Sequence, residues 1–240
     1  MMYRTPLVAA ACSFIVSACA APIDPVAEEI ARDQAQYNAF VDARRDAITV
    51  DLNVDTSASS SDLLSTAPTN DTAQLNGAYT LNADSAISPR IEGEMRMNVN
   101  FGNNTVSGSL HNNYHDPDHI GESSVVELDG SVGFSGNIDM DPSGGFVDST
   151  NTTRWQMEAS GADTLTDTPV GGDTATIYRV DIDINGNFYD TSAVGNLAGV
   201  GEVGDLASAG QIEGNLDVTS AGDSTIYDIT SGSYFVYELE

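Results

Sequence analysis

The stretch IEGEMRMNVNFGNNTVSGSL, residues 91–110, decides the fold of this protein, because its hydrophobicity repeats every second residue. One face of its first half is apolar or glycine, and consists of Ile91, Gly93, Met95, Met97, Val99 and Phe101. The alternate positions are polar or charged, and are Glu92, Glu94, Arg96, Asn98 and Asn100. Residues 178–188, YRVDIDINGNF, alternate in the same way. Such segments are typical of strands with one buried and one wet face, and they predict an antiparallel sheet.

A glycine lies at the centre of many of these apolar faces, with an apolar residue two positions away on each side. The pattern surrounds Gly77, Gly93, Gly108, Gly130, Gly136, Gly186 and Gly214. Glycine weakens an ordinary strand, so its repeated presence needs a structural reason. A small closed barrel supplies one, because its strands bend sharply and its narrow interior has little room for side chains. We therefore predict an all-β fold, a single antiparallel barrel of about eight to ten strands over residues 72–240.

The first residues are typical of an export signal. Residues 1–4 are weakly positive, residues 6–16 are apolar and small, and residues 16–19, VSAC, end at Cys19. This resembles the bacterial lipobox, whose cysteine receives diacylglycerol before cleavage, so we predict a lipoprotein signal peptide over residues 1–18 and lipidation of Cys19. Three acyl chains would anchor the protein firmly. Because Ala20 follows instead of an inner-membrane retention aspartate, we expect the outer membrane; the alternative is an ordinary signal peptide cut at Ala18 or Ala20.

The anchor also bears on which way the barrel faces. Alternation alone does not distinguish a soluble barrel from one whose apolar face meets lipid. A membrane-spanning barrel would make the lipid anchor redundant, and the sequence lacks the aromatic girdles of such barrels. The chain also ends in the acidic residues of YFVYELE, residues 234–240. We therefore expect a soluble barrel on a lipid anchor.

Residues 19–71 are predicted to tether the barrel to that anchor. Residues 25–46 have a helical pattern, in which Val26, Ile30, Tyr37 and Val41 approximate one apolar face. Residues 47–55 alternate and predict an extra strand. Residues 56–72, TSASSSDLLSTAPTNDT, are rich in serine and threonine and predict a linker.

Charge narrows the choice of partners. Among the 240 residues, 36 are acidic and 8 basic, which gives a formal net charge of −28 at pH 7. All the basic residues are arginines. An acidic protein repels phosphate backbones, so nucleic acid is excluded as an expected partner. No cysteine follows Cys19, so the mature chain has neither a disulfide nor a thiol nucleophile.

Three segments resemble the barrel domain of the transferrin-binding protein B family. GEMRMNVNFGNNTVSGSL (93–110) is similar to its strand–turn–strand, APTNDTAQLNGAYTL (67–81) to the opening of small bacterial relatives, and GNFYDTSAVGNLAGVG (186–201) to its Gly-x-Phe-Tyr-Gly segment. Asp190 stands where that family usually has the second glycine. The resemblance covers about residues 67–205 and implies a single-barrel surface lipoprotein with a dedicated outer-membrane export partner. It does not extend to transferrin binding, because the chain has room for one barrel and no handle domain.

These features predict a non-enzymatic lipoprotein of the outer membrane, without a cofactor, and leave open whether the barrel faces the periplasm or is displayed at the cell surface. It would capture a protein or a small nutrient ligand through loops at the barrel end and deliver it to an outer-membrane transporter. The sequence leaves the ligand and the oligomeric state open. The alternative is a structural or adhesive acidic surface lipoprotein with no small-molecule ligand. The sequence contains no G-x-S-x-G motif and no complete metal site, so a hydrolase is not expected.

SLHNNYHDPDH, residues 109–119, contains every histidine of the chain, and its metal-ligating side chains are His111, His115, Asp116, Asp118 and His119. Zinc and copper accept such ligands. Parity places His111 on the wet face at the end of a strand. Pro117 prevents a helix from stacking the other rings, so we expect His115 and His119 in a polar loop and no dedicated metal site.

Two further motifs are expected to be structural. DIDING, residues 181–186, matches the start of a calcium-binding EF-hand loop, but Ser192 occupies the twelfth position, where a bidentate glutamate is needed. A strand explains its alternation more simply. Trp155 alternates with Met157 and Ala159, so we expect it in the core rather than in a ligand site.

Overall fold

A computed structural model describes the protein at residues 25–51, 63–64, 72–83, 90–116, 125–141, 154–167, 174–192, 196–197 and 200–239. These residues form one helix, α1 (Pro25–Asp51), and ten strands. The strands are β1 (Thr72–Asn82), β2 (Arg90–Asn100), β3 (Thr105–Asp116), β4 (Val126–Leu128), β5 (Val132–Asp141), β6 (Arg154–Asp167), β7 (Thr176–Asp190), β8 (Asn196–Leu197), β9 (Gly201–Ser220) and β10 (Asp223–Leu239). The predicted signal peptide and Cys19 lie outside the described residues.

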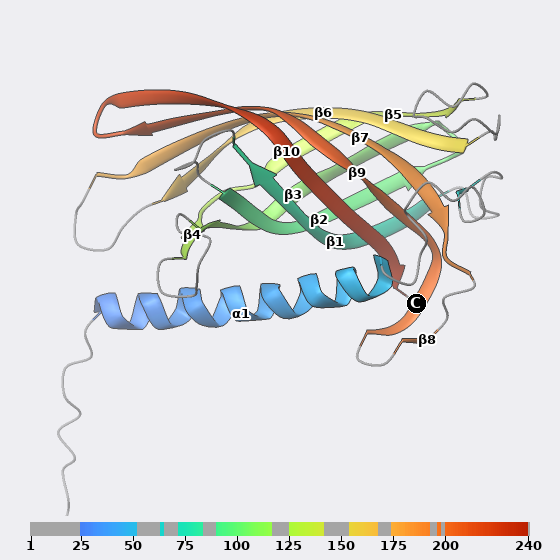
Figure 1. Cartoon of the computed structure of the whole chain (residues 1–240), viewed down its shortest axis with the longest axis horizontal. Coiled ribbons are helices and arrows are strands. Elements are labelled where there is room, and N and C mark those ends of the chain that lie inside the picture. The colour runs from blue at the N-terminus through green and yellow to red at the C-terminus, as the bar shows by residue number, and fades with distance from the viewer. Residues whose placement is uncertain are drawn as a thin grey trace, which may run out of the picture.

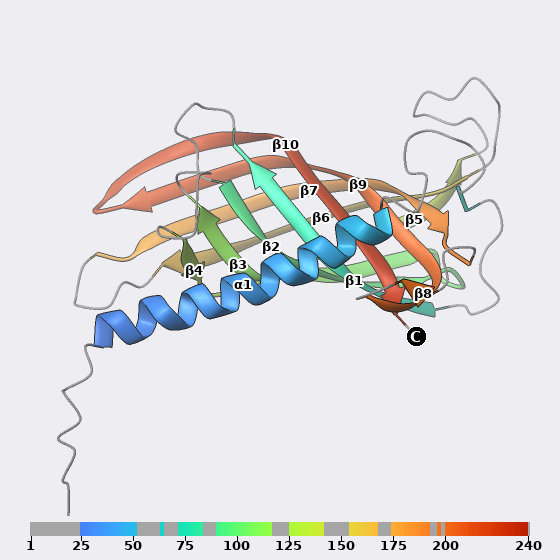
Figure 2. The ribbon, with the colours of Figure 1, turned by 60° about the horizontal axis from the view of Figure 1, so that its bottom comes forward.

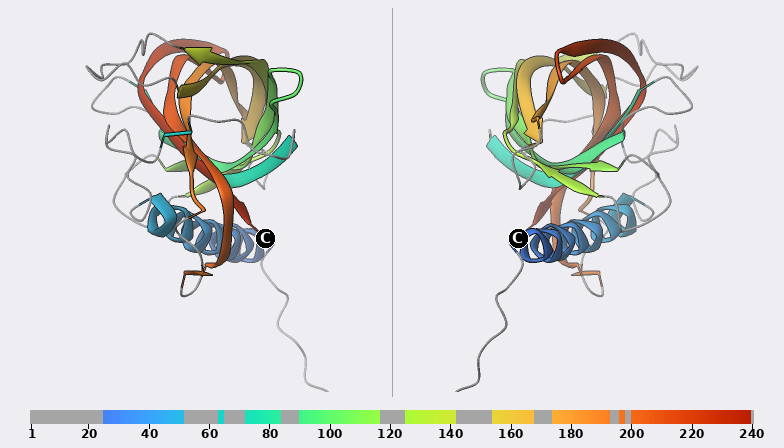
Figure 3. Two further views of the ribbon diagram at one scale, coloured as in Figure 1. Left: turned by 90° about the vertical axis from the view of Figure 1, so that its right-hand side faces the viewer. Right: turned by 90° about the vertical axis from the view of Figure 1, so that its left-hand side faces the viewer.

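The long strands close into an antiparallel barrel, as predicted. Hydrogen bonds join them in the order β10-β1-β2-β3-β5-β6-β7-β9, and β9 pairs with β10 to complete the circle. β4 pairs only with β3, and β8 pairs only with β9. Viewed along the barrel, the strands form a ring and α1 lies outside it (Figure 3). This is a closed eight-stranded barrel with two short additional strands.

The inward faces of the strands fill the barrel. Alternate residues of β2 and β7, including Ile91, Met95, Ile182 and Ile184, are completely buried, whereas Arg96 and Asp183 between them are exposed. The DIDING segment is thus an ordinary strand. Trp155 is 8% exposed and packs edge to face on Phe101 at 5.3 Å, which confirms its place in the core.

Strand glycines make room for neighbouring strands and large side chains. A Cβ atom at Gly108 would overlap the ring of Phe134 and the backbone of the adjacent strand. A Cβ atom at Gly186 would overlap the hydroxyl of Tyr234, whose side chain extends from β10 over Gly210 of β9 to reach β7. The small barrel therefore accommodates aromatic residues at some inward positions only because others carry no side chain.

A β-bulge in β3 changes which residues face outward. Asn112 has a φ of 47°, and the pairing with β2 shifts there, so that Glu94 is opposite His111 but Glu92 is opposite Tyr114. Bulges reorient the side chains that follow them. Beyond this bulge, Asn113 is buried and accepts a hydrogen bond from Tyr79, while Tyr114 packs outside the barrel.

Helix α1 lies along the outer wall of the barrel (Figures 1 and 2). Two predictions about this segment are wrong: that a strand begins at residue 47, and that Val41 belongs to the buried face of the helix. The helix continues to Asp51, so residues 47–51 are not a strand, and residues 52–55 lie outside the described part of the chain. The face it buries on the barrel consists of Tyr37, Phe40, Ala47 and Val50, whereas Val41 is 39% exposed. The helix therefore extends because this apolar face has a surface to cover. In the described ranges, no helix is long and apolar enough to span a bilayer.

Part of the predicted linker belongs to the barrel. Leu63 and Leu64 lie between the ends of β6 and β7, where the Leu64 N–H donates to the Phe188 carbonyl at 2.9 Å and the Leu64 carbonyl accepts from the Trp155 N–H at 3.1 Å. The Leu64 side chain joins the interior core and the Leu63 side chain joins the cluster beneath α1. The two leucines thus pack against one end of the barrel, and the linker prediction for them is wrong.

Candidate binding groove

A groove of about 950 Å³ runs between the carboxyl-terminal half of α1 and the outer wall of the barrel. Its helical wall includes Arg44, Ala47 and Ile48, and its floor crosses β6, β7, β9, β10 and β1. The volume lies within the range of ordinary ligand pockets, about 300–1,000 Å³. We therefore take this groove as the candidate functional site.

Strand register builds the floor of the groove as two rows of outward-facing residues. The first row is Gln156, Asn187, Ala209, Phe235 and Ala78, and each residue is directly opposite the next on the neighbouring strand. The second row is Glu158, Asn185, Gln211, Ser233 and Thr80, paired in the same way. Directly opposed residues share one face of an antiparallel sheet. The rows thus form a continuous surface across five strands.

The floor of the groove carries both polar and apolar side chains. Over β6 and β7 the groove presents side-chain amides, each of which carries both donors and an acceptor for hydrogen bonds. Over β9, β10 and β1 the first row is apolar, with Ala209, Ala78 and the half-buried ring of Phe235, whereas the second row is polar, with Gln211, Ser233 and Thr80. The buried Tyr189 also lines the groove. The floor is therefore amphipathic, with one apolar stretch bordered by polar residues.

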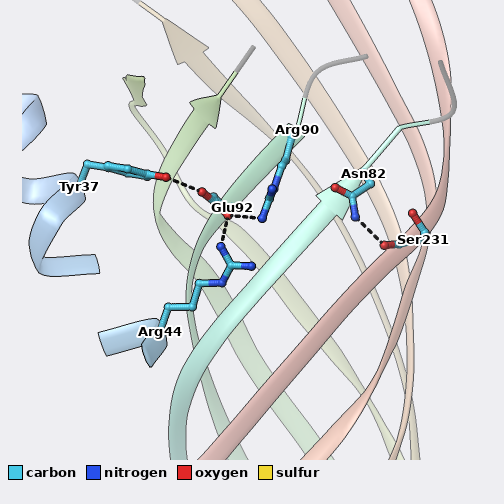
Figure 4. Close-up of polar contacts among 6 residues, drawn as sticks. All are labelled: Tyr37, Arg44, Asn82, Arg90, Glu92 and Ser231. Atoms are coloured by element: carbon cyan, nitrogen blue, oxygen red, sulfur yellow. Dashed lines mark hydrogen bonds and ion pairs between the residues drawn. The ribbon is translucent and has the colours of Figure 1, made fainter. Parts of the chain in front are cut away.

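A buried carboxylate holds the helical wall in place. Glu92 is 1% exposed on the outer face of β2, next to Thr80 of the groove floor. Its oxygens accept hydrogen bonds from the Tyr37 hydroxyl at 2.9 Å and from the guanidinium groups of Arg44 at 2.7 Å and Arg90 at 2.9 Å (Figure 4). A buried charge is stable only when it is paired and hydrogen-bonded, and Glu92 meets both conditions.

Aromatic packing supports the same attachment. The ring of Tyr114 contacts Tyr37 edge to face at 5.4 Å and stacks on Phe40 at 5.5 Å. Tyr114 faces α1 because the bulge at Asn112 turns it outward. A local feature of β3 therefore fixes the helix that forms one wall of the groove.

The groove is acidic overall. Glu158 of β6 and Glu213 of β9 both line it and are exposed. Arg44 lines the opposite wall, but its guanidinium is already paired with Glu92. An anionic ligand would thus meet uncompensated negative charge, whereas a neutral or cationic ligand would not.

The structure separates two of the candidate metal ligands, His111 and His115. His111 faces outward, with its Nε2 atom 3.4 Å from the Glu94 carboxylate, and a hydrogen bond from His111 lowers the pKa of Glu94. His115 is inside β3 rather than in a loop, so that expectation is wrong. The bulge at Asn112 turns His115 toward the barrel interior, where Nδ1 is 3.1 Å from the Tyr178 hydroxyl and burial raises the pKa of Tyr178 to about 12.

The remaining candidates add no metal site within the ranges the structure describes. Asp116 ends β3, but the position of its side chain, like residues Asp118 and His119, is outside the described part of the protein. In the described part, no group of three or more histidine, cysteine or carboxylate side chains is placed to hold a metal ion.

The groove was not predicted from the sequence, although the polar residues of its floor occupy a recognisable pattern of strand positions. Gln156, Asn185, Asn187 and Gln211 lie at the outward positions of strands predicted to be amphipathic. Their convergence depends on which strands are neighbours and on where α1 docks, and neither appears in the sequence. Comparisons of the chain with protein families, curated proteins and solved structures found no match.

Proposed function

We propose that this protein is a non-enzymatic binding protein, held at the bacterial outer membrane by a lipid on Cys19, that captures a neutral, hydroxyl-rich ligand such as an oligosaccharide. The observation that carries the proposal is the amphipathic groove beside α1. The groove is rigid on both sides, because its floor is a closed barrel and its wall is attached through Glu92. Preorganised surfaces bind with a smaller entropic cost.

The ligand class follows from the chemistry of the floor. Amide side chains both donate to and accept from hydroxyl groups, which suits a ligand with many of them. The ring of Phe235 and the adjacent alanines offer an apolar surface for the less polar face of a sugar ring. The carboxylates of Glu158 and Glu213 disfavour anionic ligands. Together these groups fit a neutral saccharide better than a nucleotide or a fatty acid.

The groove supports binding more than catalysis. A hydrolytic site needs an activated nucleophile or an oriented acid–base pair. Glu158 and Glu213, the carboxylates of the groove, are both exposed to solvent. We accordingly propose capture without chemical conversion, and without a cofactor.

The groove replaces the barrel-end loops as our proposed site of capture. The filled barrel interior leaves the outer wall and the ends as binding surfaces, and the outer wall offers the groove beside α1. The resemblance to the transferrin-binding protein B family stays a prediction. Surface display, the export partner and the outer-membrane transporter that would receive the ligand stay predictions as well.

The alternative function is structural or adhesive, with no small ligand. The formal charge of −28 favours it, because a strongly acidic surface keeps a coat protein hydrated and dispersed. In that case the groove would bind no saccharide, and cross-linking on intact cells would recover envelope polymers or further copies of the protein instead of a transporter.

Calorimetry on the purified full-length protein tests the groove. The probes are neutral oligosaccharides, with an acidic oligosaccharide and an uncharged peptide as comparisons. We expect a neutral saccharide to bind, and Ala209→Trp, which fills the floor of the groove, to abolish binding. Ser107→Trp on the exposed face of β3 is the matched control and should bind as the unchanged protein does. Binding that survives Ala209→Trp would place the ligand elsewhere, and binding of the peptide alone would change the ligand class.

A separate experiment tests the anchor. Mass spectrometry of the amino terminus of protein isolated from its native membrane should find Cys19 carrying the mass of its acyl chains. An unmodified amino terminus at Ala20 or Ala21 would remove the lipid anchor from the proposal, without affecting the groove.

A further inference from the structure

The amino-terminal part of β10 is an open strand edge. β10 pairs with β9 from Asp223 onward, but its other side meets β1 only at residues 233–237 and at an isolated bridge between Ile229 and Ala83. Residues 223–228, DSTIYD, therefore have a strand partner on one side only among the described residues. The hairpin of β9 and β10 projects beyond the end of the barrel (Figures 1 and 2).

This edge is regular and ordered by its own hairpin. A two-residue turn of Ala221 and Gly222, with φ values of 53° and 92°, closes the hairpin in the geometry that suits the twist of paired strands. The ladder to β9 is unbroken from Asp223 to Ile229. Backbone groups of a strand alternate between its two sides, so about three N–H and three C=O groups of the segment point to the open edge.

The segment has few of the features that usually protect an edge. Natural edge strands are blocked by charged side chains, above all lysine, by proline or by bulges, and DSTIYD contains no lysine, no proline and no bulge, only an aspartate at each end. Ile226 is 68% exposed, the most exposed of the large hydrophobic side chains in the described protein. An unprotected backbone edge with an exposed apolar side chain is a surface on which an additional strand can form.

Charge determines which strand fits. Asp223 and Asp228 stand at the two ends of the segment, and Asp228 continues a row through Asn215 to Asp181 on the neighbouring strands. Exposed Asp183 and Glu213 form the next row. A strand that pairs with this edge is stabilised if it carries basic side chains toward the acidic face and an apolar one beside Ile226.

The net charge disfavours a second copy of the protein as the occupant of this edge. The formal charge of −28 on each chain makes two copies repel each other.

We propose that residues 223–228 of β10 are a docking site for a protein partner that adds an extended, basic segment as an antiparallel strand. The partner's backbone pairs with β10, its apolar residue covers Ile226, and its lysine or arginine side chains reach Asp223 and Asp228. This surface is distinct from the groove beside α1, so both can be occupied at once.

Peptide binding to the purified full-length protein tests the proposal. The probe is a fluorescent peptide, Lys-Thr-Val-Thr-Thr-Lys, whose lysines come opposite Asp228 and Asp223 and whose valine comes opposite Ile226 in the antiparallel register. Its comparison has glutamate in place of each lysine. Two further probes carry N-methyl groups on alternate residues, each set removing the N–H groups of one peptide edge. We expect the lysine peptide to bind, the glutamate peptide to fail, and one methylated set to weaken binding about tenfold or more while the other does not.

Protein variants locate the site. Ile226→Lys and the double variant Asp223→Asn, Asp228→Asn should each weaken the lysine peptide about tenfold, with thermal unfolding unchanged because these side chains are exposed. Hydrogen exchange should show new protection at residues 223–228. Equal binding by both methylated peptides would reduce the interaction to charge attraction and overturn strand addition. Protection elsewhere, absence of binding, or a dimer protected at this edge would also overturn the proposal.

Discussion

Removing Arg44 tests whether the buried carboxylate of Glu92 holds α1 on the barrel. Glu92 is 1% exposed and accepts three hydrogen bonds, of which that from Arg44, at 2.7 Å, is the shortest. Arg44→Met keeps most of the aliphatic stem of the side chain and removes the guanidinium. Tyr37 and Arg90 would remain as partners, so the carboxylate loses one donor and is not left as an isolated charge.

The expected loss follows from this geometry. A hydrogen bond to a charged group contributes about 1.5–3 kcal/mol. Arg44 is 34% exposed, so water competes for its guanidinium and the lower part of the range applies, about 1.5–2 kcal/mol. For a chain of this size each kcal/mol corresponds to a shift of about 2–4 °C in Tm. We thus expect Arg44→Met to lower Tm by about 3–8 °C.

Urea denaturation followed by circular dichroism measures the loss in free energy of unfolding, and thermal denaturation measures the shift in Tm. Hydrogen exchange should show that the loss of protection is in α1. Arg45→Met is the matched control, because Arg45 pairs with Asp42 on the helix surface and both side chains are 66% exposed. Such a pair contributes less than about 0.5 kcal/mol. A double-mutant cycle of Arg44→Met with Glu92→Gln isolates the interaction. A coupling energy below about 0.5 kcal/mol, or an equal loss in Arg45→Met, would refute the argument.

Three further predictions concern packing and pH. Gly186→Ala should destabilise the protein by about 1–3 kcal/mol in urea denaturation, because the added methyl group overlaps a buried tyrosine hydroxyl; Gly133→Ala, whose methyl group would meet nothing within 4 Å, should be close to neutral. Burial raises the pKa of Tyr178 from 10.0 to about 12, so this tyrosine ionises at lower pH in the unfolded chain than in the folded protein. The free energy of unfolding should therefore fall as the pH rises from 10 to about 12. An alkaline titration in which this tyrosine ionises near pH 10 in the folded protein would contradict the structure. His111 lowers the pKa of Glu94 below its ordinary value of 4.5, so the stability from this pair should be present above pH 4.5 and lost as the pH falls through the lowered pKa, and His111→Ala should raise that pKa in an NMR titration.

The spacing of apolar residues and glycines along the sequence was enough to predict the strands and the closed barrel. The alternation of residues 91–101 and 178–188 reflects a backbone whose side chains point to opposite faces in turn, so a single strand already reveals its buried face. The strand glycines indicated a barrel because their cause, crowding inside a closed sheet, acts at every strand. Trp155 was placed correctly for the same reason, since its neighbours at two-residue spacing are apolar.

The wrong predictions concern segments whose structure depends on contacts with residues far away in the sequence. His115 was assigned to a loop because the strand was taken to end near His111 and Pro117 follows. β3 instead continues to Asp116, and the bulge at Asn112 that turns His115 inward depends on how β3 pairs with β2. Residues 47–51 alternate like a strand, yet they are helical, because Ala47 and Val50 complete a face that packs on the barrel. Leu63 and Leu64 lie in a serine-rich stretch whose composition indicates a linker, but two neighbouring strand ends bind their backbone.

Sequence by itself therefore determined the class of fold, the inward face of each strand and the acidic character of the surface. Only the tertiary structure decided the candidate sites. The groove exists because Gln156, Asn187 and Phe235, far apart in the chain, lie in one row on strands that become neighbours on closure, and because α1 docks beside them. The open edge of β10 exists because β1 ends before β10 does. Side-chain alternation is a property of one strand, whereas register and docking are properties of pairs of segments, and a single sequence does not encode them as a local pattern.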